Sequence, residues 1–293
     1  MWFFRSPRIV FGEDSLSFLS MVESKRFLIV TDRYLAGTKI LEKVKKAIPP
    51  DSETMVFAKI GSEPLLSEMT SDMDSIYRFN PEVIIGLGGG SSMDAAKIIF
   101  ALYEKPGLSA YDITPMDNFG FGSRSKLVAI PTTSGTGSEC SWAAVFSDDR
   151  EKRKNEVASP EILPDYAILD PDLVLDLPRE QTVNTAVDAI THAVESYVSQ
   201  WNNHYSDILA EKALSLITPN LSRVLSDPHD VAARESVHIG ASMAGLSFSN
   251  SQIGLAHALG HALGACFNIP HGKTVGLYLP EVVRYNYNKA GVK

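Results

Sequence analysis

The sequence has 293 residues and carries 27 lysine and arginine against 35 aspartate and glutamate side chains, a formal net charge of −8. A general nucleic-acid-binding protein needs a basic face to displace counterions from phosphate, so this acidity argues against that class. With 44% hydrophobic and 21% charged residues, the composition is typical of an ordinary globular protein. Such a length suits two domains or one large one.

Three features of the sequence indicate the cellular compartment: its apolar runs, its N-terminus and its cysteines. No apolar run approaches the roughly 20 residues that cross a bilayer, and Val83–Leu87 and Ile98–Leu102 are among the longest. The N-terminus lacks the charged start, long apolar centre and cleavage site of a secretory signal. Cys140 and Cys266 lie far apart among apolar or small residues, so we expect two reduced, buried thiols. We therefore expect a cytoplasmic protein that binds neither membranes nor nucleic acid.

Short apolar runs and amphipathic stretches alternate through the first half of the chain. This rhythm of strand and helix is typical of a parallel sheet flanked by helices. The strand and helix pairs are Phe27–Thr31 and Tyr34–Ala47, Thr54–Ala58 and Leu65–Phe79, and Val83–Leu87 and Ser91–Tyr103. Further short strands are expected at Leu127–Ile130, Ala143–Phe146 and Tyr166–Leu169, with a charged turn at Asp148–Lys154.

Beyond Pro178 the pattern becomes helical, with apolar residues at three- and four-residue spacing. The predicted helices are Glu180–Gln200, Tyr205–Leu225, Val231–Phe248 and Leu255–Ala265. Asp227-Pro228 and Pro270-His271-Gly272 interrupt the pattern. We therefore expect an α/β domain with a parallel sheet over residues 1–178 and an all-α domain over residues 179–293.

A glycine run follows the predicted buried strand Val83–Leu87. Gly88–Gly90 leads through Ser91 into a helix that is expected to begin near Met93. Glycines let the backbone approach an anion closely, and a helix N-terminus supplies free N–H groups and the positive end of its dipole. The run therefore fits a pyrophosphate cradle, although the G-x-G-x-x-G spacing of the dinucleotide fingerprint fails. A tight strand-to-helix turn without a ligand is the structural alternative.

A second loop, Pro131–Glu139, follows the predicted strand Leu127–Ile130. Its nine residues include five hydroxyl side chains and two glycines. These residues can form hydrogen bonds with a phosphate or ribose, and they have little apolar surface to bury in a core. A capped turn without a ligand is the alternative.

Asp32 ends the first predicted strand, at the sheet edge where ligands of open α/β sheets gather. A carboxylate there suits the ribose hydroxyls of NAD and disfavours the 2′-phosphate of NADP. The same residue fits a helix N-cap equally well.

Carboxylate and imidazole side chains gather in the helical half. Asp188 and His192 stand four residues apart on one predicted helix, and His257 and His261 repeat that spacing on another. His271 follows His257 by 14 residues. Imidazoles with one carboxylate suit divalent iron, zinc, nickel or cobalt and disfavour calcium or magnesium. One such histidine alone is usually a packed core residue, but their joint occurrence predicts a metal site. The remaining histidines are expected at the surface: His204, His229 and His238.

Together these motifs resemble the iron-containing (group III) alcohol dehydrogenase family over essentially the whole chain. The likeness rests on Pro7–Gly12, Gly88–Ser91 with Asp94 and Lys97, Pro131–Glu139, Leu169–Pro171, Asp188–His192 and His257–His271. Gly254–His261 and Ile269–Gly272 are highly specific, whereas the glycine run is shared with glycerol dehydrogenases and dehydroquinate synthases.

The resemblance implies a dehydroquinate synthase-like architecture, one divalent metal, with iron ahead of zinc or nickel, and NAD in preference to NADP. It implies that the metal is bound by Asp188, His192, His257 and His271, and that His261 is the catalytic histidine near the nicotinamide. It implies that the cofactor is held by Asp32, Gly88, Gly89, Gly90, Ser91, Thr132, Thr133, Thr136 and Lys154. A solvated charged face suits Lys154 nearly as well.

We therefore expect a metal-dependent oxidoreductase that moves a hydride between a small alcohol, or its aldehyde or ketone, and NAD(H), in a homodimer or larger homo-oligomer. Family members continue for several more helices, so we expect the helical domain to be truncated at the C-terminus, with apolar surface exposed. The alternatives are a dehydroquinate-synthase-like lyase, a glycerol-dehydrogenase-like enzyme and an inactive truncated paralogue. A lyase needs more basic residues near the metal than Glu180–Ala265 offers, which are Lys212, Arg223 and Arg234.

Overall fold

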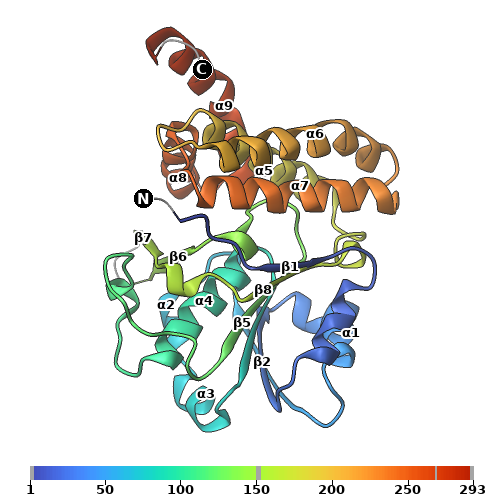
Figure 1. Ribbon diagram of the computed structural model, residues 1–293, viewed down its shortest axis with the longest axis vertical. Helices are drawn as coiled ribbons and strands as arrows, with labels where there is room; N and C mark the ends of the chain where they lie inside the picture. Colours follow the sequence, from blue (N-terminus) through green and yellow to red (C-terminus); the bar gives the residue numbers. More distant parts are fainter. Residues whose placement is uncertain (1–2, 150–152, 268, 291–293) are drawn as a thin grey trace. The chain divides into compact units, whose positions relative to one another are not determined.

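The computed structural model describes residues 3–149, 153–267 and 269–290. The chain divides into two compact units (Figure 1). The α/β unit is formed by Ser6–Thr132 and Ser138–Leu173. The helical unit is formed by the chain up to Arg5, by the loop Thr133–Gly137 and by the chain from Val174 onward.

A six-stranded, fully parallel sheet is the centre of the α/β unit (Figure 1). In spatial order its strands are β1 (Arg8–Phe11), β8 (Tyr166–Leu169), β5 (Lys126–Pro131), β4 (Val83–Gly88), β2 (Arg26–Asp32) and β3 (Glu53–Ile60). The central strands are nearly continuous apolar runs because both faces of the sheet are covered. The parallel sheet predicted from the sequence is therefore confirmed.

Helices and short 3-10 turns cover both faces of this sheet. They are η1 (Ser15–Met21), η2 (Leu35–Gly37), α1 (Lys39–Ala47), α2 (Leu66–Thr70), α3 (Met73–Phe79), α4 (Gly90–Glu104), η3 (Ala110–Asp112), η4 (Ser138–Cys140), η5 (Pro160–Ile162) and η6 (Pro171–Leu173). Alternate residues of β2 point to opposite faces. Leu28 therefore packs in the same apolar cluster as Ile98 of α4, and Phe27 packs with Leu41 of α1.

Three local features of the α/β unit differ from the sequence prediction. The segment around Ala143–Phe146 does not join the parallel sheet, because β6 (Ala143–Asp148) pairs antiparallel with β7 (Arg153–Ala158) in a separate hairpin. Of the predicted charged turn, residues 150–152 lie outside the described residues, and its end begins β7. The predicted helix Leu65–Phe79 is two short helices, α2 and α3.

Strand β1 was not predicted, since its apolar run is only three residues long, Ile9 to Phe11, and does not alternate. Helix α4 begins at Gly90 rather than near Met93, because Gly89 already accepts the first helical hydrogen bond from the Met93 N–H. The glycine run is therefore partly inside the helix that it precedes.

In the described part of the helical unit, the α-helices are α5 (Arg179–Tyr197), α6 (His204–Ser226), α7 (Val231–Ser249), α8 (Leu255–Phe267) and α9 (His271–Ala290). The first four match the predicted segments. Small residues fill the core between them, such as Ala189 of α5, Ala213 of α6 and Ala241 of α7. Asn203 caps α6 through a reciprocal capping box with Ser206. The predicted interruption at residues 270–272 is the start of α9.

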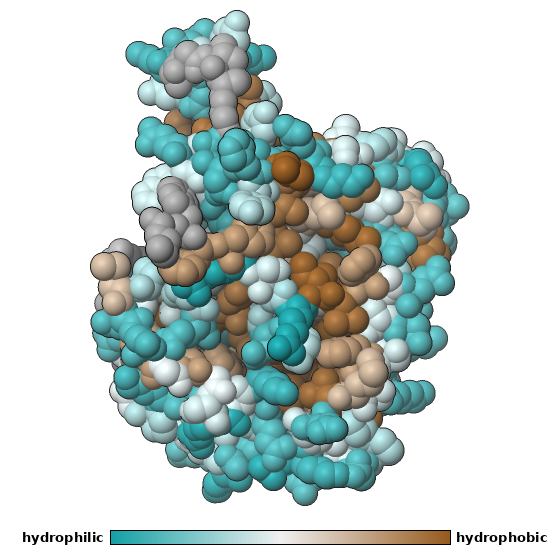
Figure 2. All heavy atoms as spheres, viewed as in Figure 1, coloured by the Kyte–Doolittle hydropathy of each residue, from teal (hydrophilic) through white to brown (hydrophobic). Residues whose placement is uncertain are grey.

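The surface of the described residues partly matches the sequence prediction. None of their helices has the length and apolar character that a membrane span requires. Hydrophilic side chains dominate the surface around α3 in Figure 2.

Cys140 is buried as expected, but Cys266 is exposed, which corrects the prediction of two buried thiols. Cys266 lies on the last turn of α8, where Ala265 and Phe267 are exposed as well, so this end of the helix is not covered by the rest of the described helical unit.

Candidate active site

Helix α5 presents three acidic or imidazole side chains on one face of the helical unit. Asp188, His192 and Glu195 follow one another at four- and three-residue spacing, so they share a face of the helix. Their exposed fractions are 2%, 5% and 2%. Helix α8 adds the buried His257, and α9 adds its first residue, the partly exposed His271. The helical unit thus brings together all four predicted metal ligands.

The carboxylate of Asp188 is the centre of this cluster. Its Oδ1 atom lies 3.3 Å from Nε2 of His271, 3.5 Å from Nε2 of His257 and 4.0 Å from Nε2 of His192. Ligands about 2.1 Å from one tetrahedral cation stand roughly 3.4 Å apart. The first two separations match that value and the third is slightly wider. Ligand atoms of Asp188, His192 and His257 lie within 4.8 Å of one another, so these three side chains are spaced to share one cation, and His271 contacts the same Asp188 oxygen.

Polar atoms of the cluster are buried without hydrogen-bond partners. They include Oδ1 of Asp188 and Nε2 of His257, which face each other, and Nδ1 of His192. A buried polar atom without a partner costs about 1–3 kcal/mol, so a bound ion or water is one explanation for such atoms in a native structure. A divalent transition-metal ion accepts this donor set of imidazole nitrogen and carboxylate oxygen. The residues present therefore fit a divalent metal ion.

Burial lowers the pKa values of the imidazoles, and the neighbouring carboxylates raise them. Burial lowers the pKa of His192 to about 3, despite the nearby Asp188 carboxylate. Burial also opposes protonation of His257, but its contacts with Asp188 and Glu195 outweigh this and raise its pKa to about 9. Burial alone would raise the pKa of Asp188, yet the imidazoles of His192 and His271 hold it well below its usual range. The carboxylate at the centre is thus ionised.

Glu195 is a member of this site that the sequence analysis missed. Its Oε2 accepts hydrogen bonds from Nδ1 of His257 at 2.5 Å and from the Gly254 N–H at 3.0 Å. Its Oε1 accepts the Ala256 N–H at 2.6 Å. The signal was present in the sequence, because Glu195 stands three residues after His192 on the same helical face.

His261 lies beside the cluster, with ring contacts to two of its histidines. Its ring centroid is 4.8 Å from that of His271 and 6.2 Å from that of His257. The side chain is partly exposed on α8. A partly exposed imidazole next to a buried cluster is suited to carry protons between the site and solvent.

His238 is buried, so the prediction that it lies at the surface is wrong. It is 2% exposed on α7, where Nδ1 forms a 2.9 Å hydrogen bond with the hydroxyl of Ser134. The loop Thr133–Gly137 packs closely on the helices, because a Cβ atom on Gly135 would lie 2.6 Å from the side chain of Thr185. Burial lowers the pKa of His238 to about 4, so its ring is neutral. His204 and His229 are exposed as expected.

The glycine run lies in the α/β unit, between β4 and α4. Gly88 has a φ of +142°, and a Cβ atom on it would lie 2.6 Å from Oγ of Ser92. Ser91 donates its hydroxyl to the carbonyl of Ser62 at 2.7 Å, whereas Oγ of Ser92 is buried without a partner. The Thr132 N–H donates to the carbonyl of Gly88 at 2.9 Å. The first N–H groups of α4 and Thr132 therefore lie around one small-residue turn.

The other predicted cofactor residues are divided between the two units. Thr133 and Thr136 belong to the loop segment of the helical unit. Asp32 ends β2, and its Oδ1 accepts the N–H groups of Tyr34 and Leu35, both at 2.8 Å. It therefore caps the turn that follows, as the structural alternative supposed.

Lys154 lies on β7, and its Nζ is 2.6 Å from Oε1 of Glu63. Burial alone would raise the pKa of Glu63, but Lys154 holds it below its usual range. Glu63 directly follows Ser62, the residue that accepts the hydroxyl of Ser91. Lys154 is thus linked to the segment that contacts the glycine turn.

Two family models match the chain. Residues 6–171 match the model described as iron-containing alcohol dehydrogenase, and residues 182–293 match the model described as Fe-containing alcohol dehydrogenase family, C-terminal.

Curated relatives with similar sequences are alcohol dehydrogenases. The 1-propanol dehydrogenase of Salmonella typhimurium is 37% identical over 279 residues, which cover 95% of this chain and 72% of the relative. The NADPH-dependent butanol dehydrogenase of Clostridium saccharobutylicum is 33% identical over 290 residues, 97% of this chain and 74% of the relative. The bifunctional aldehyde-alcohol dehydrogenase of Escherichia coli is 39% identical, and the match covers 90% of this chain but 31% of that longer protein.

Solved structures give the same result. An iron-containing alcohol dehydrogenase from Thermococcus thioreducens has a TM-score of 0.90 at 32% identity, over 99% of this chain and 77% of the other. A sulfoacetaldehyde reductase from Bifidobacterium kashiwanohense, solved in complex with NAD+, has a TM-score of 0.90 at 25% identity, over 98% of this chain and 77% of the other.

Proposed function

The chain belongs to the iron-containing alcohol dehydrogenase family, and we propose that it interconverts a short alcohol and its aldehyde or ketone with NAD(H) at the cluster around Asp188. The observation that carries this proposal is the pair of buried atoms Oδ1 of Asp188 and Nε2 of His257, 3.5 Å apart and both without a hydrogen-bond partner. Such a pair is stable when a cation lies between the two atoms.

The metal ligands in this proposal are Asp188, His192, His257 and His271. Divalent iron is our first assignment, and zinc or nickel also suits three imidazoles and a carboxylate. When bound, the ion supplies Lewis acidity that favours the deprotonated form of an alcohol. Asp188 contributes one negative charge from a buried position, and a metal ion would bind His257 in competition with the proton that its raised pKa of about 9 favours. Glu195, which contacts His257, is a second buried carboxylate beside the proposed cation site.

His261 carries the proton in this scheme. Its ring lies 4.8 Å from that of His271 and its side chain is partly exposed, so it can exchange a proton with solvent. A positioned general acid or base of this kind typically contributes about 10²- to 10⁴-fold to the rate.

The cofactor in this proposal lies with its pyrophosphate at the turn between β4 and α4. Support comes from Gly88, whose positive φ and close contact with Ser92 leave no space for a side chain, and from the free N–H groups at the start of a 15-residue helix. We place the boundary between the cofactor-binding and metal-binding domains near residue 178. The gap between the two matched regions, 6–171 and 182–293, supports that position.

The preference for NAD over NADP rests on Asp32. Similar proteins include an NADPH-dependent enzyme and one solved with NAD+, so the relatives leave both cofactors open. A carboxylate at the end of β2 would accept hydrogen bonds from ribose hydroxyls and repel a 2′-phosphate.

The lyase alternative is not favoured. Two of the basic residues of the helical unit that could hold a phosphorylated substrate are engaged elsewhere. Arg223 pairs with Asp230 at 2.8 Å, and the buried Arg234 donates to the hydroxyl of Thr182 at 2.9 Å. The similar proteins are named dehydrogenases or reductases.

A substrate panel tests the proposed function. The chelated protein is reloaded with Fe²⁺ or Zn²⁺ under anaerobic conditions and incubated with propan-1-ol, butan-1-ol and propane-1,3-diol, each with NAD and with NADP. We expect metal-dependent formation of NADH with a short primary alcohol. Equal turnover before and after chelation, or no reduced cofactor with any alcohol in the loaded protein, would contradict the proposal.

A further inference from the structure

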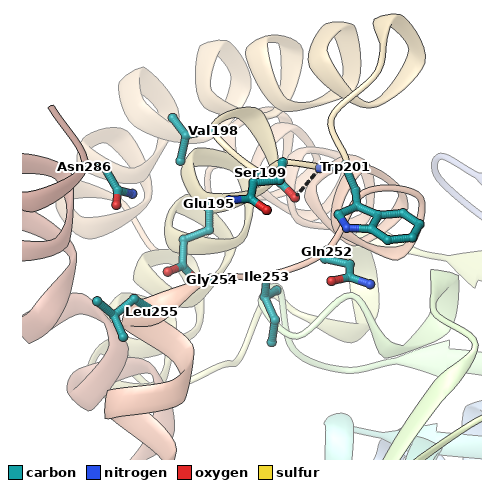
Figure 3. A pocket seen from close by; sticks show the side chains of 10 residues that line it. Glu195, Val198, Ser199, Trp201, Gln252, Ile253, Gly254, Leu255 and Asn286 are labelled. Carbon is teal, nitrogen blue, oxygen red and sulfur yellow. Dashed lines mark hydrogen bonds between the residues drawn. The ribbon is translucent and has the colours of Figure 1, made fainter. Parts of the chain in front are cut away.

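We propose that Glu195 is a positioning residue that aims the ring of His257 at the metal. This inference rests on the proposed metal site, and it assigns a role to a residue that does not contact the cation. The side chain leaves α5 and points toward the segment Gly254–Leu255, beside a cavity of about 260 Å³ (Figure 3).

The carboxylate of Glu195 determines which nitrogen of His257 carries the proton. An ionised carboxylate only accepts hydrogen bonds, so the 2.5 Å contact requires that Nδ1 of His257 donates. The lone pair of the neutral ring is then on Nε2, the atom that lies 3.5 Å from Oδ1 of Asp188. Glu195 therefore fixes both the tautomer and the direction of the metal-binding nitrogen.

The backbone around Glu195 is built to receive this carboxylate. Its two oxygens also accept the N–H groups of Gly254 and Ala256 at the start of α8. A Cβ atom on Gly254 would lie 2.9 Å from Oε1, so only glycine permits this approach. The preceding Gln252 has a φ of +141°, a conformation that non-glycine residues rarely adopt. One carboxylate thus holds the start of the helix and the ring on its first turn.

His192 provides an internal contrast. Its Nδ1 is buried without a hydrogen-bond partner, although its ring stacks on that of His257 with centroids 4.3 Å apart. Of the two described histidine ligand candidates on α5 and α8, His257 is therefore the one whose Nδ1 is hydrogen-bonded to a carboxylate. A change at Glu195 is expected to act on one ligand rather than on the whole cluster.

The decisive variant is Glu195→Gln, which keeps the side-chain length. The amide oxygen still accepts a backbone N–H of α8, but the amide NH2 group now faces Nδ1 of His257. That arrangement favours a proton on Nε2, which blocks metal binding. Glu195→Asp is the second variant, because aspartate still caps the helix while its shorter side chain withdraws from the ring. Glu211→Gln, on an exposed position of α6, is the matched control.

The probe is Co²⁺ added to the chelated protein, with affinity measured by competition with a chelator. We expect Glu195→Gln to bind Co²⁺ roughly 10- to 100-fold more weakly than the unchanged protein, as for other residues that orient a ligand. Glu195→Asp should also bind more weakly while its metal-free melting temperature stays close to that of the unchanged protein. Proton NMR of the Co²⁺ form should show an exchange-protected imidazole N–H that Glu195→Gln loses.

The outcomes separate this inference from the proposed function. If the unchanged protein binds no Co²⁺ at a single tight site, both fail. If it binds Co²⁺ and Glu195→Gln binds equally well, the proposed metal site stands and the positioning role of Glu195 is wrong. The positioning role is also wrong if affinity falls while the protected N–H resonance remains, because Glu195 then acts only on helix stability.

Discussion

A Cβ atom on Gly272 would overlap the main-chain carbonyl oxygen of Asn184. Helix α9 therefore touches α5 backbone to backbone, one turn before Asp188. Gly276 makes a second close approach, because a Cβ atom there would overlap the side chain of Val187. These two glycines allow α9 to come close enough for Nε2 of His271 to lie 3.3 Å from Oδ1 of Asp188.

Replacing Gly272 with alanine should therefore push α9 away from α5. We expect Gly272→Ala to lose roughly 1–3 kcal/mol of unfolding free energy through overpacking and to bind Co²⁺ at least about tenfold more weakly, because His271 leaves the cluster. Urea unfolding and chelator competition measure the two effects. Gly37→Ala is the control, since a Cβ atom there meets nothing within 4 Å. A Gly272→Ala protein with unchanged metal affinity would show that His271 is not a ligand.

Periodicity predicted most of the fold because the core is built from regular apolar spacing. The runs that became β2 and β4 are buried on both faces, so their apolar character was continuous and easy to recognise. The hairpin strand β7 was missed because its exposed side chains, such as Lys154 and Glu156, give no apolar alternation. The spacing of apolar residues therefore identifies buried helices and strands, and it overlooks strands whose side chains are exposed to solvent.

The proposed ligand set was visible in sequence because paired residues on one helix recur at fixed spacing. The supporting residues were not, because their roles depend on contacts between distant segments. Glu195 acquires its role from Gly254 and His257 on another helix. His238 was expected at the surface because nothing in its own helix shows that the loop carrying Ser134 covers it. Tertiary contacts of this kind require the structure.

Two histidines on α8 should respond differently to substitution. His257→Ala removes a nitrogen from the proposed ligand set, so we expect metal content and turnover to disappear together. His261→Ala should retain the metal, because the His261 ring lies beside the cluster, 6.2 Å from that of His257. Its turnover should fall by about 10²- to 10⁴-fold through loss of proton transfer.

Elemental analysis and steady-state kinetics on the same preparations distinguish the two roles. His204→Ala, at an exposed position on α6, should match the unchanged protein in both measurements. Loss of metal from His261→Ala would instead make His261 a ligand, and full metal content in His257→Ala would remove His257 from the set.

Asp32 gives a prediction about the cofactor. Asp32→Asn keeps an oxygen that can accept the N–H groups of Tyr34 and Leu35, so the turn after β2 should survive. It removes the negative charge that would repel a 2′-phosphate. We expect the ratio of kcat/KM with NADP to that with NAD to rise roughly tenfold, which corresponds to about 1.4 kcal/mol.

The control is Asp117→Asn, which changes the net charge equally at an exposed loop position. The ratio should not move in that variant. An unchanged ratio in Asp32→Asn, with normal stability, would limit Asp32 to capping the turn.

His238 gives a prediction about acid stability. Its pKa is about 4 in the folded protein because of burial, compared with 6.5 for an ordinary histidine. Between these values the unfolded chain binds one more proton at this position than the folded chain. The free energy of unfolding therefore rises with pH across this window, and the contribution is complete above 6.5 and lost as pH falls toward 4. The full effect is about 3 kcal/mol.

The variant His238→Asn isolates this term, because its side-chain oxygen can still accept the hydroxyl of Ser134 but does not titrate in this range. In urea unfolding with a chelator present, the unchanged protein should lose up to about 3 kcal/mol more than His238→Asn between about pH 7 and about pH 4. Other groups, including His257, titrate in both proteins and cancel in the difference. The exposed His229→Asn should follow the unchanged protein. Parallel pH profiles for His238→Asn and the unchanged protein would mean that His238 takes up its proton without unfolding, through a water or a movement of the loop carrying Ser134.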